Sequence, residues 1–347
     1  MKIIGCDFHP SYQQIAMLDM STGELSGRRL LHVAEAEAFY RHLGGPVRVG
    51  MEAIGNALWF ERLMAELGYE LWIGDAARIR ASVVRQQKTD ARDAAHLLEL
   101  MLHERFPRIW VPSPEERDLR QLLLHRHKLV EMRTQVKNQL QHLALNQGVR
   151  RRHRLWSRAG RTALEQLALP PWTARRRKEL LGLLDELDPS LKELDQVVAQ
   201  QAQARDDARQ LMTQAGVGPV VALAVVLTLG PVERFRSGKH VASYFGLIPR
   251  EHSSGGRQRL GAISKQGNPF VRTLLVQAAH VAVRYDPELR RQYLRLAQRK
   301  HRAVAIARKL AVRLYGILRR RAQDSEAVGS MPGSPSHAVV EVQGPSA

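Results

Sequence analysis

Lys2-Ile3-Ile4-Gly5-Cys6 is a short apolar run that leads directly into an acidic residue, Asp7. A run of this length and character predicts a buried β-strand. Two more strand-like segments follow at residues 14–18 and 29–32, and the first of them comes after the turn-like His9-Pro10-Ser11. This close spacing predicts a meander of three antiparallel strands.

Helices and strands alternate through the rest of the N-terminal region. Separated mainly by glycine and proline, the predicted segments are a helix at 35–43, a strand at 47–51, a helix at 56–67, a strand at 70–73 and a helix at 91–104. The order β-β-β-α-β-α-β-α is that of the ribonuclease-H-like fold. In that fold the first and fourth strands are neighbours, and the last helix packs beside them. We therefore predict an α/β domain over residues 1–108.

Two long amphipathic helices are predicted after this domain. Ser113-Pro114-Glu115-Glu116 has the pattern of a helix N-terminus, with a capping serine, a proline in the first turn and a glutamate that completes a capping box. Leucines at helical spacing continue to residue 147, and the pattern returns over residues 180–212. We expect an antiparallel coiled-coil arm over residues 109–212, with a basic insertion between its helices.

The remaining sequence predicts a mainly helical domain and a tail. Residues 213–322 hold an apolar helical segment, a glycine-containing loop and a basic helical segment. Gly216 and Gly218 lie in a tight turn of the helix-hairpin-helix type, whose backbone N–H groups could bind a DNA phosphate, and a simple packing turn is an equal alternative. Serine, glycine and proline are frequent over residues 323–347, which predicts a disordered tail.

The charge of the chain indicates a nucleic-acid partner. Lysine and arginine number 53 against 34 aspartate and glutamate, a formal net charge of +19 at pH 7. This excess is typical of proteins that bind DNA or RNA, and no segment has the combined apolar and basic faces of a membrane-surface helix. No apolar run is long enough to span a membrane. The single cysteine, Cys6, excludes a disulfide framework and a cysteine-rich zinc site, so we expect a cytoplasmic, nucleoid-associated protein.

Basic segments are the predicted nucleic-acid contacts. Between the two long helices, a run of arginines is interleaved with Trp156, which favours phosphate contact and base stacking over a merely solvated face. Other basic residues flank the loop Ser253-Ser254-Gly255-Gly256. The predicted contacts are Arg150, Arg151, Arg152, Arg154, Arg250, Arg257, Arg259, Lys265 and Arg272, together with Gly216 and Gly218.

Four carboxylates form the candidate metal site. Asp7 ends the first predicted strand and Glu52 the fourth, while Asp90 and Asp93 share one face of the first turn of a helix. The predicted fold brings these positions together, and converging carboxylates are what Mg²⁺ or Mn²⁺ needs for phosphoryl transfer. Structural roles remain open for three of these residues: helix capping by Asp90, ion pairing of Asp93 with Arg92 or Lys88, and a turn that Asp7 closes with His9.

The loop Ser253-Ser254-Gly255-Gly256 is the candidate carrier of a nucleophile. Its two hydroxyls lie beside paired glycines and among basic residues, which predicts an exposed loop that attracts anions. Taken alone, such a segment is more often a surface turn whose serines bind backbone. In a chain that also carries a metal-binding acidic set, it predicts a serine that attacks phosphate.

The chain resembles insertion-sequence family one-ten, the DEDD transposases also described as bridge-RNA-guided serine recombinases. The resemblance spans about residues 1–320 and depends on motifs in a fixed order. They are Gly5-Cys6-Asp7, Met51-Glu52-Ala53-Ile54-Gly55, Lys88-Thr89-Asp90-Ala91-Arg92-Asp93-Ala94, Ala215-Gly216-Val217-Gly218, Phe245-Gly246-Leu247-Ile248-Pro249-Arg250, Ser253-Ser254-Gly255 and Ile263-Ser264-Lys265-Gln266-Gly267-Asn268, then Arg272.

This resemblance implies a RuvC-like DEDD domain, a coiled-coil arm and a C-terminal transposase domain. The family's acidic quartet falls on Asp7, Glu52, Asp90 and Asp93, and its nucleophilic serine falls on Ser254. A structured guide RNA that pairs with donor and target DNA is implied, as is a homo-oligomer, a dimer or tetramer, on DNA. The implied activity is cleavage and rejoining of DNA through a phosphoserine intermediate.

Two other functions are compatible with these residues. A nuclease or Holliday-junction resolvase that activates water with the acidic quartet would leave free 5′-phosphate ends and would not need Ser254. A basic scaffold with a degenerate metal site would bind RNA or DNA without cutting it. The intact quartet argues against the scaffold.

Overall fold

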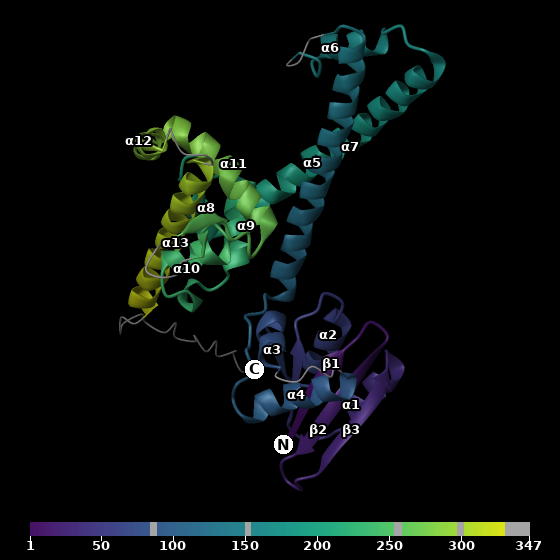
Figure 1. The fold of residues 1–347 in the computed structure, drawn as a ribbon, viewed down its shortest axis with the longest axis vertical. Helices are drawn as coiled ribbons and strands as arrows, with labels where there is room; N and C mark the ends of the chain where they lie inside the picture. The colour runs from purple at the N-terminus through teal and green to yellow at the C-terminus, as the bar shows by residue number, and fades with distance from the viewer. Residues whose placement is uncertain (84–88, 150–153, 253–258, 297–301, 330–347) are drawn as a thin grey trace, which may run out of the picture. The chain divides into compact units, whose positions relative to one another are not determined.

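The computed structural model describes residues 1–83, 89–149, 154–252, 259–296 and 302–329 (Figure 1). The chain divides into two compact units, Met1–Val111 and Pro112–Ala347. The first unit is a mixed α/β domain, and the second is mostly helical. No helix in the described part of the chain is both long and apolar enough to cross a membrane.

A five-stranded sheet forms the centre of the first unit. Its strands are β1 (Lys2–Phe8), β2 (Tyr12–Asp19), β3 (Leu25–Leu31), β4 (Val47–Glu52) and β5 (Glu70–Gly74). They lie in the order β3-β2-β1-β4-β5, with β1–β2 and β2–β3 antiparallel and with β1–β4 and β4–β5 parallel. The predictions of an antiparallel meander and of neighbouring first and fourth strands are both confirmed.

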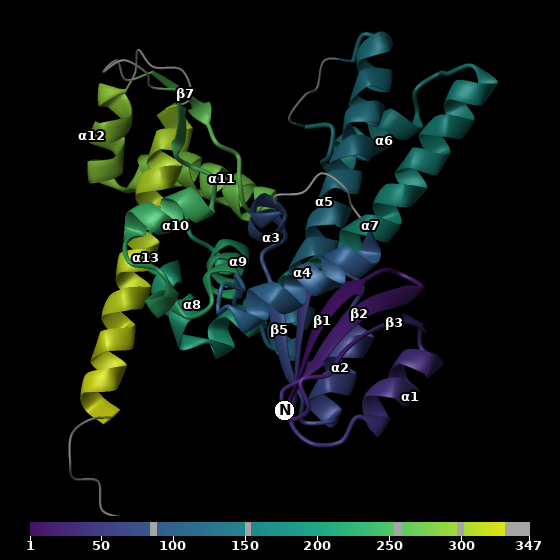
Figure 2. The same cartoon turned by 60° about the horizontal axis from the view of Figure 1, so that its bottom comes forward.

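Helices cover both faces of this sheet (Figure 2). Ile4 of β1 is buried in an apolar cluster with α1 (Ala34–His42) and α2 (Leu58–Glu66). Ile3 is buried on the opposite face, in a cluster with α4 (Asp90–Leu102). Because the side chains of a strand alternate between faces, the odd-numbered residues of β1 face α4.

Close packing of α4 on the sheet depends on two glycines. Gly5 of β1 and Gly50 of β4 are register partners, and both lie against side chains or backbone of the α4 layer. A Cβ at Gly5 would lie 2.5 Å from the backbone nitrogen of Leu98 and closer still to the carbonyl oxygen of Ala94. The absence of a side chain therefore lets the backbone of α4 approach β1 directly.

A short helix, α3 (Ala76–Ser82), lies between β5 and α4 in the chain and is absent from the sequence-based prediction. Asp75 caps it by accepting hydrogen bonds from the backbone N–H groups of Ala77 and Arg78. A helix of about two turns is too short to show an apolar period, so only its capping aspartate could have indicated it.

Two long helices, α5 (Pro114–Asn146) and α7 (Pro171–Ala204), form an arm within the second unit (Figure 1). The predicted capping box is confirmed, since the side chain of each of Ser113 and Glu116 accepts a hydrogen bond from the backbone N–H of the other. Helix α7 begins well before the predicted residue 180, because a proline in its first turn suits a helix N-terminus. It ends at residue 204, before the predicted 212, and a separate helix, α8 (Asp206–Met212), follows.

The arm helices run antiparallel. Arg126 Nε of α5 lies 2.5 Å from Asp195 Oδ1 of α7, and Arg133 Nη1 lies 3.4 Å from Asp188 Oδ1. Residue numbers thus rise along one helix as they fall along the other. Buried leucines of both helices pack in a shared apolar cluster, and the connection between them holds a short helix, α6 (Arg158–Glu165).

The rest of the second unit packs around an apolar helix, α9 (Pro219–Leu229). A helix without a polar face must be buried, and most residues of α9 are. The surrounding elements are η1 (Val232–Arg234), α10 (Gly238–Tyr244), β6 (Pro249–Glu251), β7 (Leu260–Ile263), α11 (Pro269–Tyr285), α12 (Pro287–Arg295) and α13 (Arg302–Gly329). Helix α13 continues beyond residue 322, where the tail was predicted to begin, and residues 330–347 lie outside the described part.

Candidate active site

Asp7 and Glu52 occupy equivalent positions on neighbouring strands. Cys6 of β1 pairs with Met51 of β4 in parallel register, so each carboxylate is the next residue along its strand. Both residues share the α4 face of the sheet with Gly5, because strand side chains alternate. The topology therefore brings two of the predicted carboxylates to one end of the sheet.

Asp90 is the first residue of α4 and does not cap it. The cap is Thr89, whose side-chain oxygen accepts a hydrogen bond from the backbone N–H of Arg92. The structural alternative in which Asp90 serves as the cap is therefore wrong. Asp90 and Asp93 both lie in the first turn of α4, where the helix dipole favours negative charge.

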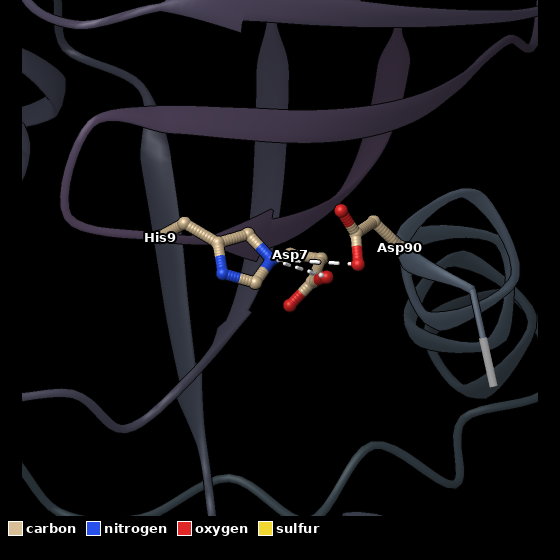
Figure 3. Close-up of side chains that lie close together, drawn as sticks. All are labelled: Asp7, His9 and Asp90. Carbon is tan, nitrogen blue, oxygen red and sulfur yellow. Dashed lines mark hydrogen bonds and ion pairs between the residues drawn. The ribbon is translucent and has the colours of Figure 1, made fainter.

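Asp7, His9 and Asp90 converge at this end of the sheet (Figure 3). One ligand-type atom from each lies within 4.8 Å of those of the other two, and all three residues are partly buried. His9 Nε2 is 3.1 Å from Asp7 Oδ2 and 3.8 Å from Asp90 Oδ1, so one imidazole nitrogen lies near both carboxylates. In the sequence analysis, a turn closed by Asp7 and His9 was the structural alternative to a metal site. The two residues are in contact, and that contact is part of the acidic group.

Glu52 and Asp93 are not members of this group. Glu52 Oε1 is 3.7 Å from the Arg80 guanidinium, an ion pair open to solvent. Asp93 acts electrostatically on Asp7 from the first turn of α4. The structure therefore brings together two of the four predicted carboxylates, adds His9, and places the other two at the same end of the sheet and the same turn of α4.

The pKa of Asp7 is raised above its ordinary value. Burial is the largest cause, the negative charges of Asp93 and Asp90 add to it, and His9 opposes it. A cation beside these carboxylates would relieve their repulsion. Oxygen ligands suit Mg²⁺ and Mn²⁺, while the nitrogen of His9 favours the softer of the two ions, Mn²⁺. The donor set Asp7, His9 and Asp90 therefore fits a divalent cation.

The serine loop connects the two strands of a hairpin, β6 and β7. The pairing extends to His252, whose N–H donates to the carbonyl of Arg259 at 2.9 Å. At the other end of the hairpin, the N–H of Ser264 donates to the carbonyl of Ile248 at 2.8 Å. Paired backbone thus flanks the candidate nucleophile on both sides in the sequence. Outside the described part lie Ser253, Ser254 and Arg257.

Two family models match the chain, and each covers one of these features. A DEDD transposase model of the IS110 type, described as "Transposase", matches residues 4–147. A second model, described as "Transposase IS116/IS110/IS902 family", matches residues 208–294. The first range contains the acidic group, and the second contains the hairpin.

Relatives that match most of the chain are also described as transposases. The chain is 34% identical over 307 residues to a protein of Pseudomonas aeruginosa described as "Probable family 20 transposase", a match that covers 84% of this chain and 90% of that protein. The chain belongs to the IS116/IS110/IS902 transposase family. It is also 27% identical to the transposase for insertion sequence element IS1111A of Coxiella burnetii, over 82% of this chain and 79% of that protein. The transposase for insertion sequence element IS1328 of Yersinia enterocolitica is 28% identical, over 77% and 82%.

Neither His9 nor Tyr12 of this transposase is among the site residues predicted from the sequence. Tyr12 donates its hydroxyl proton to Asp90 Oδ2 at 2.7 Å, and its ring stacks on His9 with ring centroids 4.5 Å apart. Their position in the sequence could have indicated them as site residues, since both lie at the turn that follows Asp7. A hairpin at that turn returns them to the end of the sheet that carries the carboxylates.

Arg272 of the transposase contacts the backbone at the base of the hairpin. Its Nη1 donates to the carbonyl oxygens of Phe245, Lys265 and Gln266 at 3.2, 3.1 and 3.3 Å. These carbonyls come from the two segments that lead into and out of the hairpin. Lys265 is itself exposed and has a positive φ of 56°. Arg272 therefore has a structural role beside its predicted role in nucleic-acid binding.

Replacing Arg272 by alanine is expected to lower the free energy of unfolding by about 1–3 kcal/mol, because three carbonyls lose a charged donor. Thermal unfolding of the full-length variant measures the change. Arg284→Ala is the matched control, since Arg284 is an exposed arginine of the same helix. An unchanged Tm combined with weaker DNA binding would instead make Arg272 a phosphate contact alone.

The turn between α8 and α9 is explained by packing at Gly216. Its φ is 81°, and a Cβ there would lie 2.8 Å from the backbone nitrogen of Ala282 in α11. Gly218, the N-cap of α9, is exposed and has nothing within 4 Å of the position of a Cβ. Gly216 therefore fits the packing alternative, whereas Gly218 has open space at the start of α9.

Most other predicted nucleic-acid contacts that the structure describes are on the surface. Arg154, Arg250 and Arg259 are exposed. Trp172, at the start of α7, is 78% exposed, as a base-stacking surface would require, whereas Trp156 is partly buried. Outside the described part of the chain lie Arg150, Arg151 and Arg152.

Proposed function

We propose that this chain is the transposase of a prokaryotic insertion sequence and that it cuts and rejoins DNA through a phosphoserine intermediate. Ser254 supplies the nucleophile, and a divalent cation, Mg²⁺ or Mn²⁺, is held by carboxylates. The observation that carries the proposal is the convergence of Asp7, His9 and Asp90 within a chain of this family. Relatives named for insertion sequences support the kind of element that is moved.

The proposed cleavage and rejoining balance without an external energy source. The hydroxyl oxygen of Ser254 bonds to phosphorus, and the bond from phosphorus to the 3′ oxygen breaks. A base takes the proton of the serine hydroxyl, and one proton is delivered to the departing 3′ oxygen, so no net proton is gained or lost. The products are a phosphoserine link to the 5′ end and a free 3′ hydroxyl. Attack on this link by another 3′ hydroxyl forms a new phosphodiester and releases the serine. A bound cation would neutralise phosphate charge and lower the pKa of a nearby hydroxyl.

In this scheme the chain's own carboxylates would hold the cation, and one of them would accept the proton. Asp7 is the proposed proton acceptor, since its carboxylate belongs to the acidic group that would lie at the reacting phosphate. His9, whose Nε2 is 3.1 Å from Asp7 Oδ2, orients that carboxylate. Asp90, Glu52 and Asp93 supply the remaining acidic oxygens.

A structured guide RNA and a homo-oligomer complete the proposed complex at the nucleoid. The net charge of +19 supports binding of several polyanions at once. A guide RNA that pairs with donor and target DNA would supply sequence specificity, so that the protein needs mainly phosphate contacts. A dimer or tetramer would bring two DNA ends to the same assembly.

Ser254→Ala is expected to abolish a covalent protein–DNA adduct, because the substitution removes the attacking oxygen. The adduct is measured on a denaturing gel with end-labelled donor DNA, with Mg²⁺ or Mn²⁺ present. Ser253→Ala is the matched control and should still form the adduct. An adduct that is lost only in Ser253→Ala would move the nucleophile by one residue, and one that persists in both variants would overturn the phosphoserine mechanism.

A metal-dependent nuclease or junction resolvase is the second candidate function. It is favoured by one observation: Asp7, His9 and Asp90 all belong to the first unit, so the acidic group needs no residue from the serine hairpin. Water would then be the nucleophile, and the products would be a free 5′ phosphate and a 3′ hydroxyl. Cleavage that survives in Ser254→Ala with free 5′ phosphates is the result that would support this alternative.

A further inference from the structure

We propose that Tyr12 is a positioning residue of the acidic group, which orients Asp90 toward a divalent cation; the inference rests on the proposed metal role of that group. Tyr12 lies in β2, whereas Asp90 opens α4, 78 residues later in the chain. The phenol hydroxyl nevertheless donates to Asp90 Oδ2 at 2.7 Å. This is a short hydrogen bond to a charged acceptor, the stronger class of protein hydrogen bond.

The hydrogen bond distinguishes the two oxygens of Asp90. Oδ2 accepts from Tyr12, while Oδ1 lies 3.8 Å from His9 Nε2, on the side of Asp7 (Figure 3). The terminal torsion of an aspartate is soft, so without the phenol the carboxylate could rotate. Tyr12 therefore fixes which oxygen faces the place where Asp7, His9 and Asp90 converge. Outer hydrogen bonds of this kind orient metal-binding carboxylates.

The ring of Tyr12 is itself held in place. It stacks with His9 at a centroid distance of 4.5 Å and an interplanar angle of 23°. The guanidinium carbon of Arg29 lies 3.7 Å from the centroid of the same ring. The backbone N–H of His9 also donates to the carbonyl of Tyr12 at 2.9 Å. A side chain that is already fixed by packing can preorganise the group to which it donates.

This arrangement follows from the strand register. Asp7 pairs with Gln14, and Gln14 pairs with Arg29, across three neighbouring strands. Tyr12 is two residues from Gln14 along β2, so it shares a face of the sheet with Asp7 and Arg29. The tight turn between β1 and β2 then places His9 and Tyr12 at the same end of the sheet as the carboxylates.

A purely structural role for Tyr12 is the alternative, since its hydroxyl also links β2 to α4. Mn²⁺ affinity separates the two roles, because a contact that serves only stability leaves the affinity of the folded protein unchanged. Tyr69→Phe is the matched control: the hydroxyl of Tyr69 donates to the carbonyl of Tyr40 at 3.2 Å. Both residues belong to the apolar cluster on the sheet face opposite α4.

Mn²⁺ binding to the full-length protein is measured by electron paramagnetic resonance of the free ion, alongside thermal unfolding. We expect Tyr12→Phe to raise the Kd for Mn²⁺ about tenfold and Tyr69→Phe to leave it unchanged. In an Asp90→Asn background, Tyr12→Phe should change the Kd no further, because the oriented carboxylate is gone.

Two outcomes would overturn the inference, and they differ in whether the proposed metal role of the acidic group also fails. If the wild type binds Mn²⁺ and Tyr12→Phe binds it equally well, Tyr12 is only a structural contact, and the metal role of the acidic group stands. If the wild type does not bind Mn²⁺ at all, the proposed metal role fails, and the role of Tyr12 fails with it.

Discussion

Replacing Asp7 by asparagine is expected to lower the rate of DNA strand cleavage at least about a hundredfold, the scale on which losing one charge-stabilising group from a reaction centre acts. Asparagine keeps the size of the side chain and can still hydrogen-bond to His9, whose Nε2 lies 3.1 Å from Asp7 Oδ2. It loses the negative charge, one cation ligand and the favoured proton acceptor. Cleavage of end-labelled donor DNA under single-turnover conditions measures the rate.

The same substitution is expected to raise the Tm of the metal-free protein at neutral pH by a few degrees. Burial, with Asp93 and Asp90, raises the pKa of Asp7 in the folded state above the ordinary value of 3.8. Below 3.8 the group is protonated in both the folded and unfolded states, so it carries no penalty. As the pH rises from 3.8 through the raised pKa, the folded state is increasingly destabilised relative to the unfolded state. Asparagine removes that penalty.

Asp19→Asn is a control for which the expected change in Tm at neutral pH has the opposite sign. Hydrogen bonds from the side chain and backbone of Ser21 hold the pKa of Asp19 below its ordinary value. That group stabilises the folded state above the unfolded pKa and loses the effect as the pH falls through the folded pKa. Its substitution should therefore lower the Tm at neutral pH.

Two results for Asp7→Asn would contradict the assignment of Asp7. One is cleavage at the wild-type rate, and the other is a Tm below that of the wild type at pH 7 in a metal chelator.

The sheet and two of its carboxylates could be predicted because they depend on local patterns. Short apolar strands separated by turn residues set the strand order, and that order places Asp7 and Glu52 at one end of the sheet. Asp90 and Asp93 were predictable for a similar reason, since a spacing of three puts both in one helical turn. The approach of His9 to both Asp7 and Asp90 depends on the side-chain geometry of the β1–β2 turn, which the periodicity of the sequence does not show.

Contacts that cross the fold could not be predicted for the basic residues. The excess of positive charge correctly indicated a DNA-processing family, but charge alone does not show which arginines bind protein carbonyls. Arg272 donates to three backbone carbonyls, which lie 6, 7 and 27 residues before it in the chain, and its role there depends on how the segments on either side of the hairpin come together. Helix limits at Pro171 and Ala204 were missed because leucine spacing shows the middle of a helix better than its ends.

Replacing Gly5 by alanine is expected to destabilise the first unit by about 3 kcal/mol or more, because the new Cβ meets backbone that cannot rotate away. It would lie 2.5 Å from the backbone nitrogen of Leu98, so α4 must move off β1. Gly27→Ala is the matched control on the same sheet, since a Cβ there has its nearest contact at 3.6 Å, an ordinary van der Waals distance. Both changes are measured by denaturant unfolding of the full-length variants, observed with a signal that comes from the first unit.

Gly50→Ala extends this series, because the closest atom to its Cβ is the sulfur of the flexible Met101 side chain and not backbone. We expect a loss of stability between those of Gly27→Ala and Gly5→Ala. A shift of α4 away from β1 would also move Asp90 away from Asp7, so Gly5→Ala should weaken Mn²⁺ binding under conditions where the protein remains folded. Wild-type stability and wild-type Mn²⁺ affinity in Gly5→Ala would show that the position of α4 does not depend on this glycine.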